Sequence, residues 1–308
     1  MCRALAYLGQ PVLLDDLLFQ PDSSLIKQTY TPKMLHMLNL AGFGMMAWDR
    51  DSYAPELPYR YTSSNLPIFD RNLWLFSQKT RADCVLAHVR GVAYSTTATV
   101  SDQNCHPFHF LRMKVALAHN GEIYRFGAMK GTLQAYLDEK YVHQIAGSTD
   151  SEWLYALLLS CLPNPARAPT SDELIAAVEK VIDILRQTRR RHGIDLSSSC
   201  NLFIATGDQI LGLRYCFDFG RFPVESPSQV READLSYLTM WFTLGREFGL
   251  YDDEWQVAGG QDATTTVLIA SEPLSSNTTN WLQVPEYGLI HAYYVNNRLH
   301  VDVRPIGI

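Results

Sequence analysis

The sequence lacks the patterns that would connect it to a membrane or to nucleic acid. No run of apolar residues is long enough to cross a bilayer. The apolar stretch after Arg3 is short and ends at Asp15-Asp16, so it does not resemble a secretory signal and predicts no leader before Cys2. The formal net charge is −6, whereas phosphate backbones are bound by basic surfaces. These absences predict a soluble protein without a membrane or nucleic-acid partner.

Cysteine is sparse, and its spacing argues against disulfides and metal sites. None of the six cysteines belongs to a Cys-x-x-Cys pair, which predicts free thiols in a reducing, cytoplasmic compartment. Cys105, His106 and His109 are near one another, but they lack the paired spacing of a zinc site, so we expect no metal. Gly-x-Ser-x-Gly and P-loop motifs are also absent. Four cysteines lie in apolar stretches and are expected in the core: Cys84, Cys161, Cys200 and Cys216.

Apolar runs predict seven buried strands, and amphipathic periodicity predicts at least three helices. The strands fall near both ends of the chain with helices between them, which is not the regular alternation of a parallel α/β sheet. The pattern therefore predicts an α+β architecture. The predicted helices are Ser151–Leu162, Asp172–Arg191 and approximately Val230–Phe248. The predicted strands are Val85–Val89, Val115–His119, Leu202–Thr206, Gln209–Tyr215, Thr265–Ala270, Leu289–Val295 and Leu299–Val303.

The helix predicted over Asp172–Arg191 has signals at both ends. Thr170 with Glu173 is typical of a capping box, and Gly193 is typical of a C-terminal stop. The run Arg189-Arg190-Arg191 falls in the last turn, where cations complement the helix dipole. We therefore interpret this basic run as part of a stable helix end rather than as a binding surface.

The second residue is a cysteine, and removal of Met1 would expose it as the N-terminus. The thiolate is the reactive form of cysteine, yet an ordinary thiol, with a pKa of about 8.5, is only slightly ionised at neutral pH. An α-amine, with a pKa of about 7.7–8.0, can accept the thiol proton, so an N-terminal cysteine can combine nucleophile and base. Position alone does not separate such a nucleophile from an incidental second residue. An activating context must come from the rest of the sequence.

Four residues downstream of Cys2 have the chemistry to complete a site. Attack on an amide carbonyl creates an oxyanion, for which Asn120 and Gly121 offer a side-chain amide and a backbone N–H. A free glutamyl group is a zwitterion, so its recognition needs one cation and one anion. Arg90, at the end of an apolar strand, can bind the α-carboxylate in a bidentate manner. Asp150, at the start of a predicted helix, can bind the α-ammonium group.

Each of these residues also has a simpler interpretation. Asn120-Gly121 is a frequent type I′ hairpin turn, and Asp150 could be a helix cap. Taken singly, these simpler interpretations are favoured. In order after Cys2, and together with Arg90, the residues favour an active site.

The ordered motifs resemble the class II glutamine amidotransferase family, the N-terminal-nucleophile hydrolases whose mature chains begin with cysteine. Two motifs resemble one branch in particular, the stand-alone amidases of glutathione degradation and ergothioneine biosynthesis: Asn104-Cys105-His106-Pro107-Phe108 and Ser271-Glu272-Pro273-Leu274. The other motifs are Met1-Cys2-Arg3, His88-Val89-Arg90, Ala118-His119-Asn120-Gly121 and Ser148-Thr149-Asp150-Ser151-Glu152.

The resemblance implies a four-layer αββα sandwich of two antiparallel sheets between helices. Residues 1–308 would form a single domain, with 275–308 as its last strands. No cofactor and no metal are implied. The implied roles are Cys2 as nucleophile, Asn120 and Gly121 as oxyanion hole, Arg90 as α-carboxylate ligand and Asp150 as α-ammonium ligand, with His119 beside the substrate and orienting Asn120.

One spacing departs from the family pattern. Members usually carry a small residue and a threonine directly after the arginine, where they help to bind the substrate carboxylate. Here the segment between Arg90 and Asn104 is longer, and Ser95-Thr96 is displaced along it. We expect Ser95 and Thr96 to take over carboxylate binding.

The activity implied by the resemblance is hydrolysis of a γ-glutamyl amide bond through a thioester. The substrate would be a small molecule, either glutamine or a γ-glutamyl peptide or thiol conjugate. The chain after residue 274 is too short for a synthase domain, so we expect no ammonia transfer within the chain. Two alternatives remain, a glutaminase subunit that supplies ammonia to a partner enzyme and a catalytically silent regulatory subunit. A homodimer is also compatible with the sequence.

Overall fold

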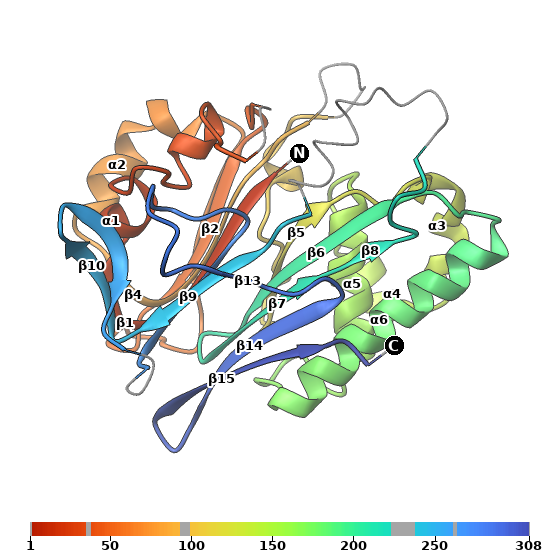
Figure 1. The fold of residues 1–308 in the computed structure, drawn as a ribbon. Coiled ribbons are helices and arrows are strands. Elements are labelled where there is room, and N and C mark those ends of the chain that lie inside the picture. Colours follow the sequence, from red (N-terminus) through yellow and green to blue (C-terminus); the bar gives the residue numbers. More distant parts are fainter. Residues whose placement is uncertain (1, 35–37, 93–98, 223–237, 261–263, 308) are drawn as a thin grey trace.

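Two antiparallel β-sheets pack face to face, with helices and a hairpin on their outer faces (Figure 1). The computed structural model describes residues 2–34, 38–92, 99–222, 238–260 and 264–307. This arrangement is the α+β sandwich of two antiparallel sheets that the sequence predicts. No helix in the described part of the chain is long and apolar enough to cross a membrane.

The first sheet has seven strands and contains the N-terminal strand β1 near its centre. β1 pairs with β12 on one side and with β4 on the other, both antiparallel. Because β4 continues into Arg90, this pairing brings the start of the chain beside the predicted carboxylate ligand. In order across the sheet, the strands are β13 (Leu282–Gln283), β9 (Trp241–Gly245), β12 (Thr266–Ala270), β1 (Arg3–Leu13), β4 (Arg81–Val89), β2 (Phe43–Trp48) and β3 (Tyr59–Ser63).

The second sheet has six strands and contains β5, the strand of the predicted oxyanion residues, at one edge. Among the strands of the described chain β5 pairs with β6, in a register that places Asn120 opposite Asn201 and Gly121 opposite Cys200, and an isolated bridge joins Leu117 to Phe108 on its other side. The short strand β8 (Cys216–Phe217) pairs with β6 beyond the end of β7. In order across the sheet, the other strands are β15 (Arg298–Pro305), β14 (Gly288–Val295), β7 (Gln209–Arg214), β6 (Ser198–Ala205) and β5 (Ala116–Gly121).

Small side chains fill much of the space between the two sheets. Ala4 and Ala6 of β1 share one buried cluster with Ala116 and Ala118 of β5. Alternate residues of a strand face opposite sides, so Leu5 and the other odd-numbered neighbours belong to the outer cluster instead. Small residues let the sheets approach closely here. Cys2 directly precedes β1, and Asn120 is the second-last residue of β5.

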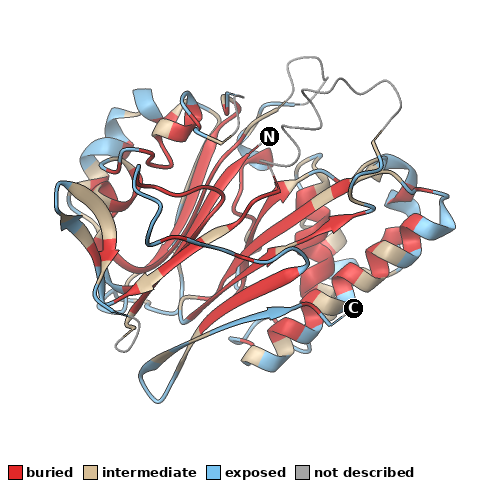
Figure 2. Cartoon of the chain, in the orientation of Figure 1, coloured by how far each residue is buried: buried red, intermediate tan, exposed pale blue. Residues whose placement is uncertain are grey.

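The outer faces of the two sheets are covered unequally. On the six-stranded sheet, α5 and α6 cover a large apolar cluster. Figure 2 shows the strands between the layers as mostly buried, while exposed residues recur along the outward face of α6. On the seven-stranded sheet the helices are short, and the hairpin of β10 (Glu247–Tyr251) and β11 (Glu254–Ala258) covers part of the face. The helices are α1 (Leu14–Leu18), α2 (Arg71–Ser77), α3 (Phe126–Gln134), α4 (Glu139–Val142), α5 (Asp150–Cys161) and α6 (Ser171–Arg191), with 3-10 turns at Lys27–Thr29, Pro67–Phe69 and Asp102–Asn104.

Both ends of α6 are formed as the sequence predicts. The Thr170 side chain accepts from the N–H of Glu173, and the Glu173 carboxylate accepts from the N–H of Thr170, which completes a capping box. Gly193 follows the helix with φ of +61°, a conformation that side chains with a Cβ adopt at a cost. The predicted helix ends are therefore confirmed.

All seven predicted strands and the helices over Ser151–Leu162 and Asp172–Arg191 are confirmed within a few residues. The helix predicted over Val230–Phe248 is wrong where the structure describes it, because residues 241–245 form β9 and residues 247–251 form β10. Residues 230–237 lie outside the described chain. An apolar run rich in aromatic residues fits either element, and here the pairing of β9 with β12 decides for a strand.

Candidate active site

Cys2 lies just before β1, at the end of the space between the sheets. It is buried, with 7% of its surface exposed. Its Sγ accepts a hydrogen bond from the N–H of Gly91 at 3.4 Å and lies 3.6 Å from the Gly91 carbonyl oxygen. Gly91 directly follows Arg90, so the structure brings the predicted nucleophile beside the predicted carboxylate ligand.

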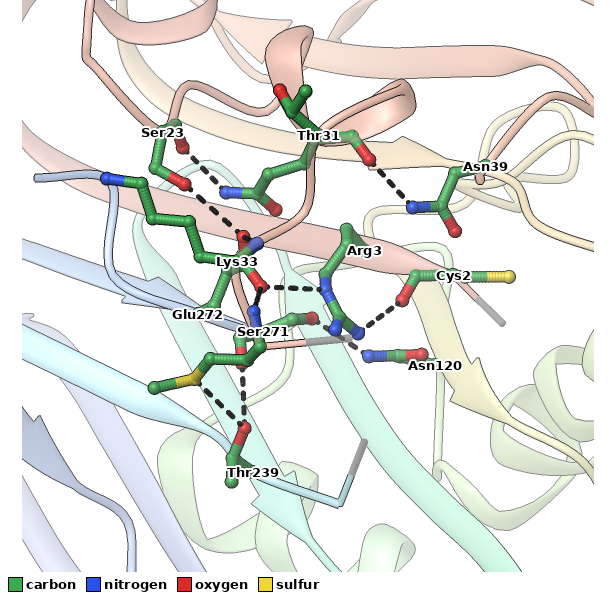
Figure 3. A network of polar contacts seen from close by, with 12 residues as sticks. Cys2, Arg3, Ser23, Thr31, Lys33, Asn39, Asn120, Thr239, Ser271 and Glu272 are labelled. Carbon is green, nitrogen blue, oxygen red and sulfur yellow. Dashed lines mark hydrogen bonds and ion pairs between the residues drawn. The ribbon is translucent and has the colours of Figure 1, made fainter. Parts of the chain in front are cut away.

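A fully buried ion pair holds the strand that carries Cys2. Arg3 Nε lies 3.3 Å from Glu272 Oε2, and Arg3 Nη1 donates to the Cys2 carbonyl at 3.1 Å (Figure 3). The Glu272 carboxylate also accepts from the backbone N–H groups of Lys33 and Met34, each at 3.0 Å. The Cys2 carbonyl points toward the guanidinium while the thiol points away from it (Figure 3). The ion pair therefore fixes the backbone of Cys2 and leaves its sulfur outside the network.

Ser271 links the strand after Cys2 to the predicted oxyanion residue Asn120. Its Oγ accepts from the N–H of Ala4 at 3.0 Å and from Nδ2 of Asn120 at 2.9 Å, the second of which is drawn in Figure 3. Because Ala4 is two residues from Cys2, this single hydroxyl connects β1 of one sheet with β5 of the other. Asn120 is fully buried, and its Oδ1 has no hydrogen-bond partner among the described residues.

Asn120 and Gly121 are the last two residues of a strand, so their interpretation as a type I′ hairpin turn is wrong. Both are paired with β6. A Cβ at Gly121 would lie 2.2 Å from the carbonyl oxygen of Ser199 and 2.4 Å from Nε2 of His119. Glycine is therefore required by the close approach of β6 and the His119 ring.

Asp150 is the first residue of α5 and not its cap. The cap is Thr149, whose side chain accepts from the N–H of Glu152. The Asp150 carboxylate accepts from the N–H of Ile123 at 2.7 Å and from the Ser151 hydroxyl at 3.1 Å. It is thus fixed to the chain that directly follows the oxyanion residues, while a carboxylate keeps further lone pairs for another donor.

His119 is fully buried and faces the helix layer. Its Nδ1 lies 2.9 Å from the Ser151 hydroxyl, and its Nε2 lies 3.3 Å from the Ser199 carbonyl oxygen. Burial lowers the pKa of His119, although the nearby Asp150 carboxylate acts in the opposite direction. Ser151 also donates to Asp150, so His119 is connected to Asp150 through one hydroxyl. The predicted role of His119 in orienting Asn120 stays a prediction, because the side-chain hydrogen bond of Asn120 among the described residues is to Ser271.

Arg90 and the Asn104 loop are joined through one backbone carbonyl. Arg90 Nη1 donates to the Thr99 carbonyl at 2.9 Å, and Asn104 Nδ2 donates to the same oxygen at 3.0 Å. Asn104 Oδ1 in turn accepts from the N–H of Ser148 at 2.8 Å, one residue before the α5 cap. Three of the sequence motifs therefore meet here. Ser95-Thr96 lies outside the described residues.

Two neutral histidines lie behind the site. His106 Nδ1 is 2.9 Å from His88 Nε2, and both rings are buried. Burial lowers the pKa of both imidazoles well below the ordinary value, so neither is charged at pH 7. Within the described chain, no three His, Cys, Asp or Glu side chains are grouped closely enough to hold a metal ion. All six thiols are free.

The amino-acid sequence of this chain is similar to those of proteins of known family. A family model described as glutamine amidotransferases class-II matches residues 72–217. The probable glutamine amidotransferase DUG3 of Saccharomyces cerevisiae is 28% identical over 308 residues, which cover 94% of this chain and 81% of that protein. The chain is thus similar to class II glutamine amidotransferases, over 94% of its length in the case of DUG3. It is an enzyme of the glutamine amidotransferase type.

Two further similar proteins extend the comparison. The gamma-glutamyl-hercynylcysteine sulfoxide hydrolase of Mycolicibacterium smegmatis is 30% identical over 128 residues, which cover 41% of this chain and 52% of that protein. The solved structure of a glutamine aminotransferase class-II domain protein from Silicibacter pomeroyi covers 100% of both chains with a TM-score of 0.60 and 17% identity. This structural likeness confirms the four-layer fold expected of class II amidotransferases.

From the sequence alone, no role was predicted for Arg3, Ser271 or Glu272. Arg3 and Glu272 are far apart in sequence, and their pairing depends on β1 lying beside β12. All three residues stand in motifs that resemble the family, Met1-Cys2-Arg3 and Ser271-Glu272-Pro273-Leu274, and that membership was the available signal for them.

Proposed function

We propose that this amidotransferase hydrolyses a γ-glutamyl amide bond with Cys2 as its nucleophile. The observation that carries the proposal is the Ser271 hydroxyl, which hydrogen-bonds both the strand of Cys2 and the side chain of Asn120. Nucleophile and oxyanion donor are thereby connected across the two sheets. The names of the two curated relatives, a glutamine amidotransferase and a γ-glutamyl hydrolase, support the substrate class.

The first half-reaction forms a thioester. After removal of Met1, the α-amine of Cys2 takes the thiol proton, and the thiolate adds to the γ-carbonyl carbon of the substrate. The carbonyl oxygen becomes an oxyanion that receives hydrogen bonds from Nδ2 of Asn120 and the N–H of Gly121. The C–N bond then breaks, and the leaving amine or ammonia takes the proton from the α-ammonium group of Cys2.

The second half-reaction releases glutamate. Water adds to the thioester while the α-amine of Cys2 accepts one of its protons. The C–S bond breaks, the thiolate regains a proton, and glutamate departs. Throughout, Arg90 holds the α-carboxylate, with Ser95 and Thr96 as further ligands, and Asp150 holds the α-ammonium group. The free thiols fit a reducing compartment, and we place the reaction in the cytoplasm.

A substrate panel tests this function. The purified protein is incubated with glutamine, glutathione and a γ-glutamyl amino acid, and glutamate and ammonia are quantified separately. We expect glutamate from at least one of these substrates, and ammonia only from glutamine. Glutamate release that occurs only when a second protein is added would instead favour the ammonia-supplying subunit. No glutamate from any of them would contradict the proposal.

Ser271 is proposed to orient the Asn120 amide. A hydroxyl can donate as well as accept, so a half-turn of the amide lets Oδ1 accept from Ser271 and directs both N–H bonds of Nδ2 into the site. This arrangement would also give a partner to Oδ1, which has none among the described residues. Ser271 would then be a positioning residue, since it touches Asn120 and not the substrate.

The variant Ser271→Ala is expected to lower kcat roughly 10- to 100-fold with little change in KM, less than the roughly 10²–10³-fold effect of removing an oxyanion donor outright. Ser275→Ala is the matched control, because Ser275 is another buried serine four residues away that contacts Asn277 and Trp281 instead. Steady-state kinetics on both variants provide the measurement. Wild-type kcat in Ser271→Ala, or a change confined to KM, would remove Ser271 from this role.

A further inference from the structure

The C-terminal end of α6 and the chain around β8 line a solvent-open cavity of about 590 Å³. Four arginines line it, against two aspartates, in a protein whose net charge is negative. The volume lies within the range of small-ligand pockets, about 300–1,000 Å³. The charged residues of its wall are Arg186, Arg189, Arg190 and Arg221 with Asp195 and Asp218.

Two of the four arginines are committed to carboxylates. Arg189 is buried and pairs with Asp218 at 3.0 Å. Arg221 pairs with Asp195 at 3.6 Å, and since both side chains are exposed this pair contributes little, about 0–1 kcal/mol. The aspartates thus offset two charges of the cavity wall.

The other two arginines have no carboxylate within ion-pair distance in the described part of the chain. Arg186 donates to the neutral hydroxyl of Tyr215 at 2.9 Å, and Arg190 is exposed. They are four residues apart on α6, so their like charges lie on one helix face, an arrangement that by itself opposes folding. A bound anion would relieve this repulsion.

The helix dipole explains cations in the last turn but not their convergence on a cavity. Arg191 also lies in that turn and complements the dipole equally well. It does not line the cavity. The helix dipole therefore accounts for Arg191 but not for the position of Arg190 at the cavity. Because both residues lie in the same turn, Arg191 is a suitable control for Arg190.

An aromatic wall adjoins these cations. The Tyr215 ring packs edge-on against Phe217 at 4.8 Å and against Tyr287 at 5.3 Å, measured between ring centres. All three residues line the cavity. The site therefore offers, beside aromatic surface, two guanidinium groups that have no carboxylate partner among the described residues.

We propose that this cavity binds a small organic phosphate. The two guanidinium groups of Arg186 and Arg190 match the charge of a phosphate dianion and donate to its oxygens in a forked geometry. The organic part lies against Tyr215, Phe217 and Tyr287. This site is distinct from the candidate active site and does not depend on the γ-glutamyl activity.

The wall of the cavity is connected to the oxyanion strand through β6. Arg189 donates to the Ser198 hydroxyl, which also accepts from the N–H of Tyr124 at 2.9 Å. The next residue, Ser199, accepts from the N–H of Glu122 at 3.1 Å. Arg189 thus holds the same strand that pairs with Asn120 and Gly121.

Isothermal titration calorimetry with phenyl phosphate as the probe tests the site, with inorganic phosphate as the second ligand. We expect saturable binding of phenyl phosphate, weaker binding of inorganic phosphate, and at least about tenfold weaker binding of phenyl phosphate to Arg186→Gln/Arg190→Gln. Arg190→Gln alone changes an exposed residue and serves if the double variant does not fold. Arg191→Gln should bind within about twofold of wild type.

Two results would overturn this assignment. One is the absence of saturable binding at millimolar phenyl phosphate. The other is equal weakening in Arg191→Gln and Arg190→Gln, which would show a general electrostatic effect of the helix end.

Discussion

Replacing Cys2 by alanine is expected to abolish γ-glutamyl hydrolysis, with a loss in kcat of roughly 10⁴-fold or more. The substitution removes the atom that forms the thioester but leaves the Arg3 contact to the backbone carbonyl of residue 2 intact. The fold should therefore be retained. Glutamate release under saturating substrate, together with the denaturant midpoint, gives both quantities.

Cys161→Ala is the matched control for the loss of a thiol. Cys161 ends α5 on the helix side of the six-stranded sheet and is only partly buried. Its substitution should leave kcat within about twofold of wild type, since it contacts none of the proposed site residues. If Cys2→Ala keeps substantial activity while remaining folded, Cys2 is not the nucleophile.

Glu272→Gln is expected to lower the free energy of unfolding by about 3 kcal/mol or more. Breaking a buried ion pair removes the Coulombic attraction that offsets the desolvation of the remaining charge, and Arg3 is fully buried. The amide also places a donor where the carboxylate accepts from Arg3 Nε and the N–H of Met34. Urea unfolding monitored by fluorescence measures the change.

Two further variants separate charge from shape. Arg3→Met combined with Glu272→Gln removes the uncompensated charge and should be more stable than Glu272→Gln alone. Glu139→Gln makes the same carboxylate-to-amide change where the side chain is 91% exposed, and it should shift stability by no more than about 0.5 kcal/mol. Equal destabilisation by Glu139→Gln and Glu272→Gln would argue against a special role for the buried pair.

Most strands and helices of the fold could be predicted from apolar patterns in the sequence. The strand over residues 85–89 is a continuous, mostly apolar run, and the helix over residues 171–191 has strong amphipathic periodicity together with its cap and stop residues. By contrast, residues 241–245 are an apolar, aromatic run that suits either a helix or a strand, and only their pairing with β12 resolves it. The strand that begins at Arg3 was not predicted, although it carries the proposed nucleophile.

The candidate site was predictable where motifs carried recognisable chemistry. Cys2, Arg90 and Asn120 were identified from residue type and order, and the structure links them through Gly91 and Ser271. The contacts themselves could not be predicted, because each joins residues more than eighty positions apart. Ser271 shows the difference, since its two hydrogen bonds exist only once the segment after β12 lies beside β1 in one sheet and β5 of the other sheet packs against them.

Reaction with a diazoketone analogue of glutamine, read out by intact mass and peptide mapping, tests the central claim most directly. If Cys2 is the nucleophile, we expect one adduct per chain, located on the thiol of residue 2, in molecules that have lost Met1. We also expect excess γ-glutamyl substrate to protect Cys2 against labelling. Labelling of another cysteine, or an unmodified Cys2 in chains that have lost Met1, would contradict the assignment of Cys2 as the nucleophile.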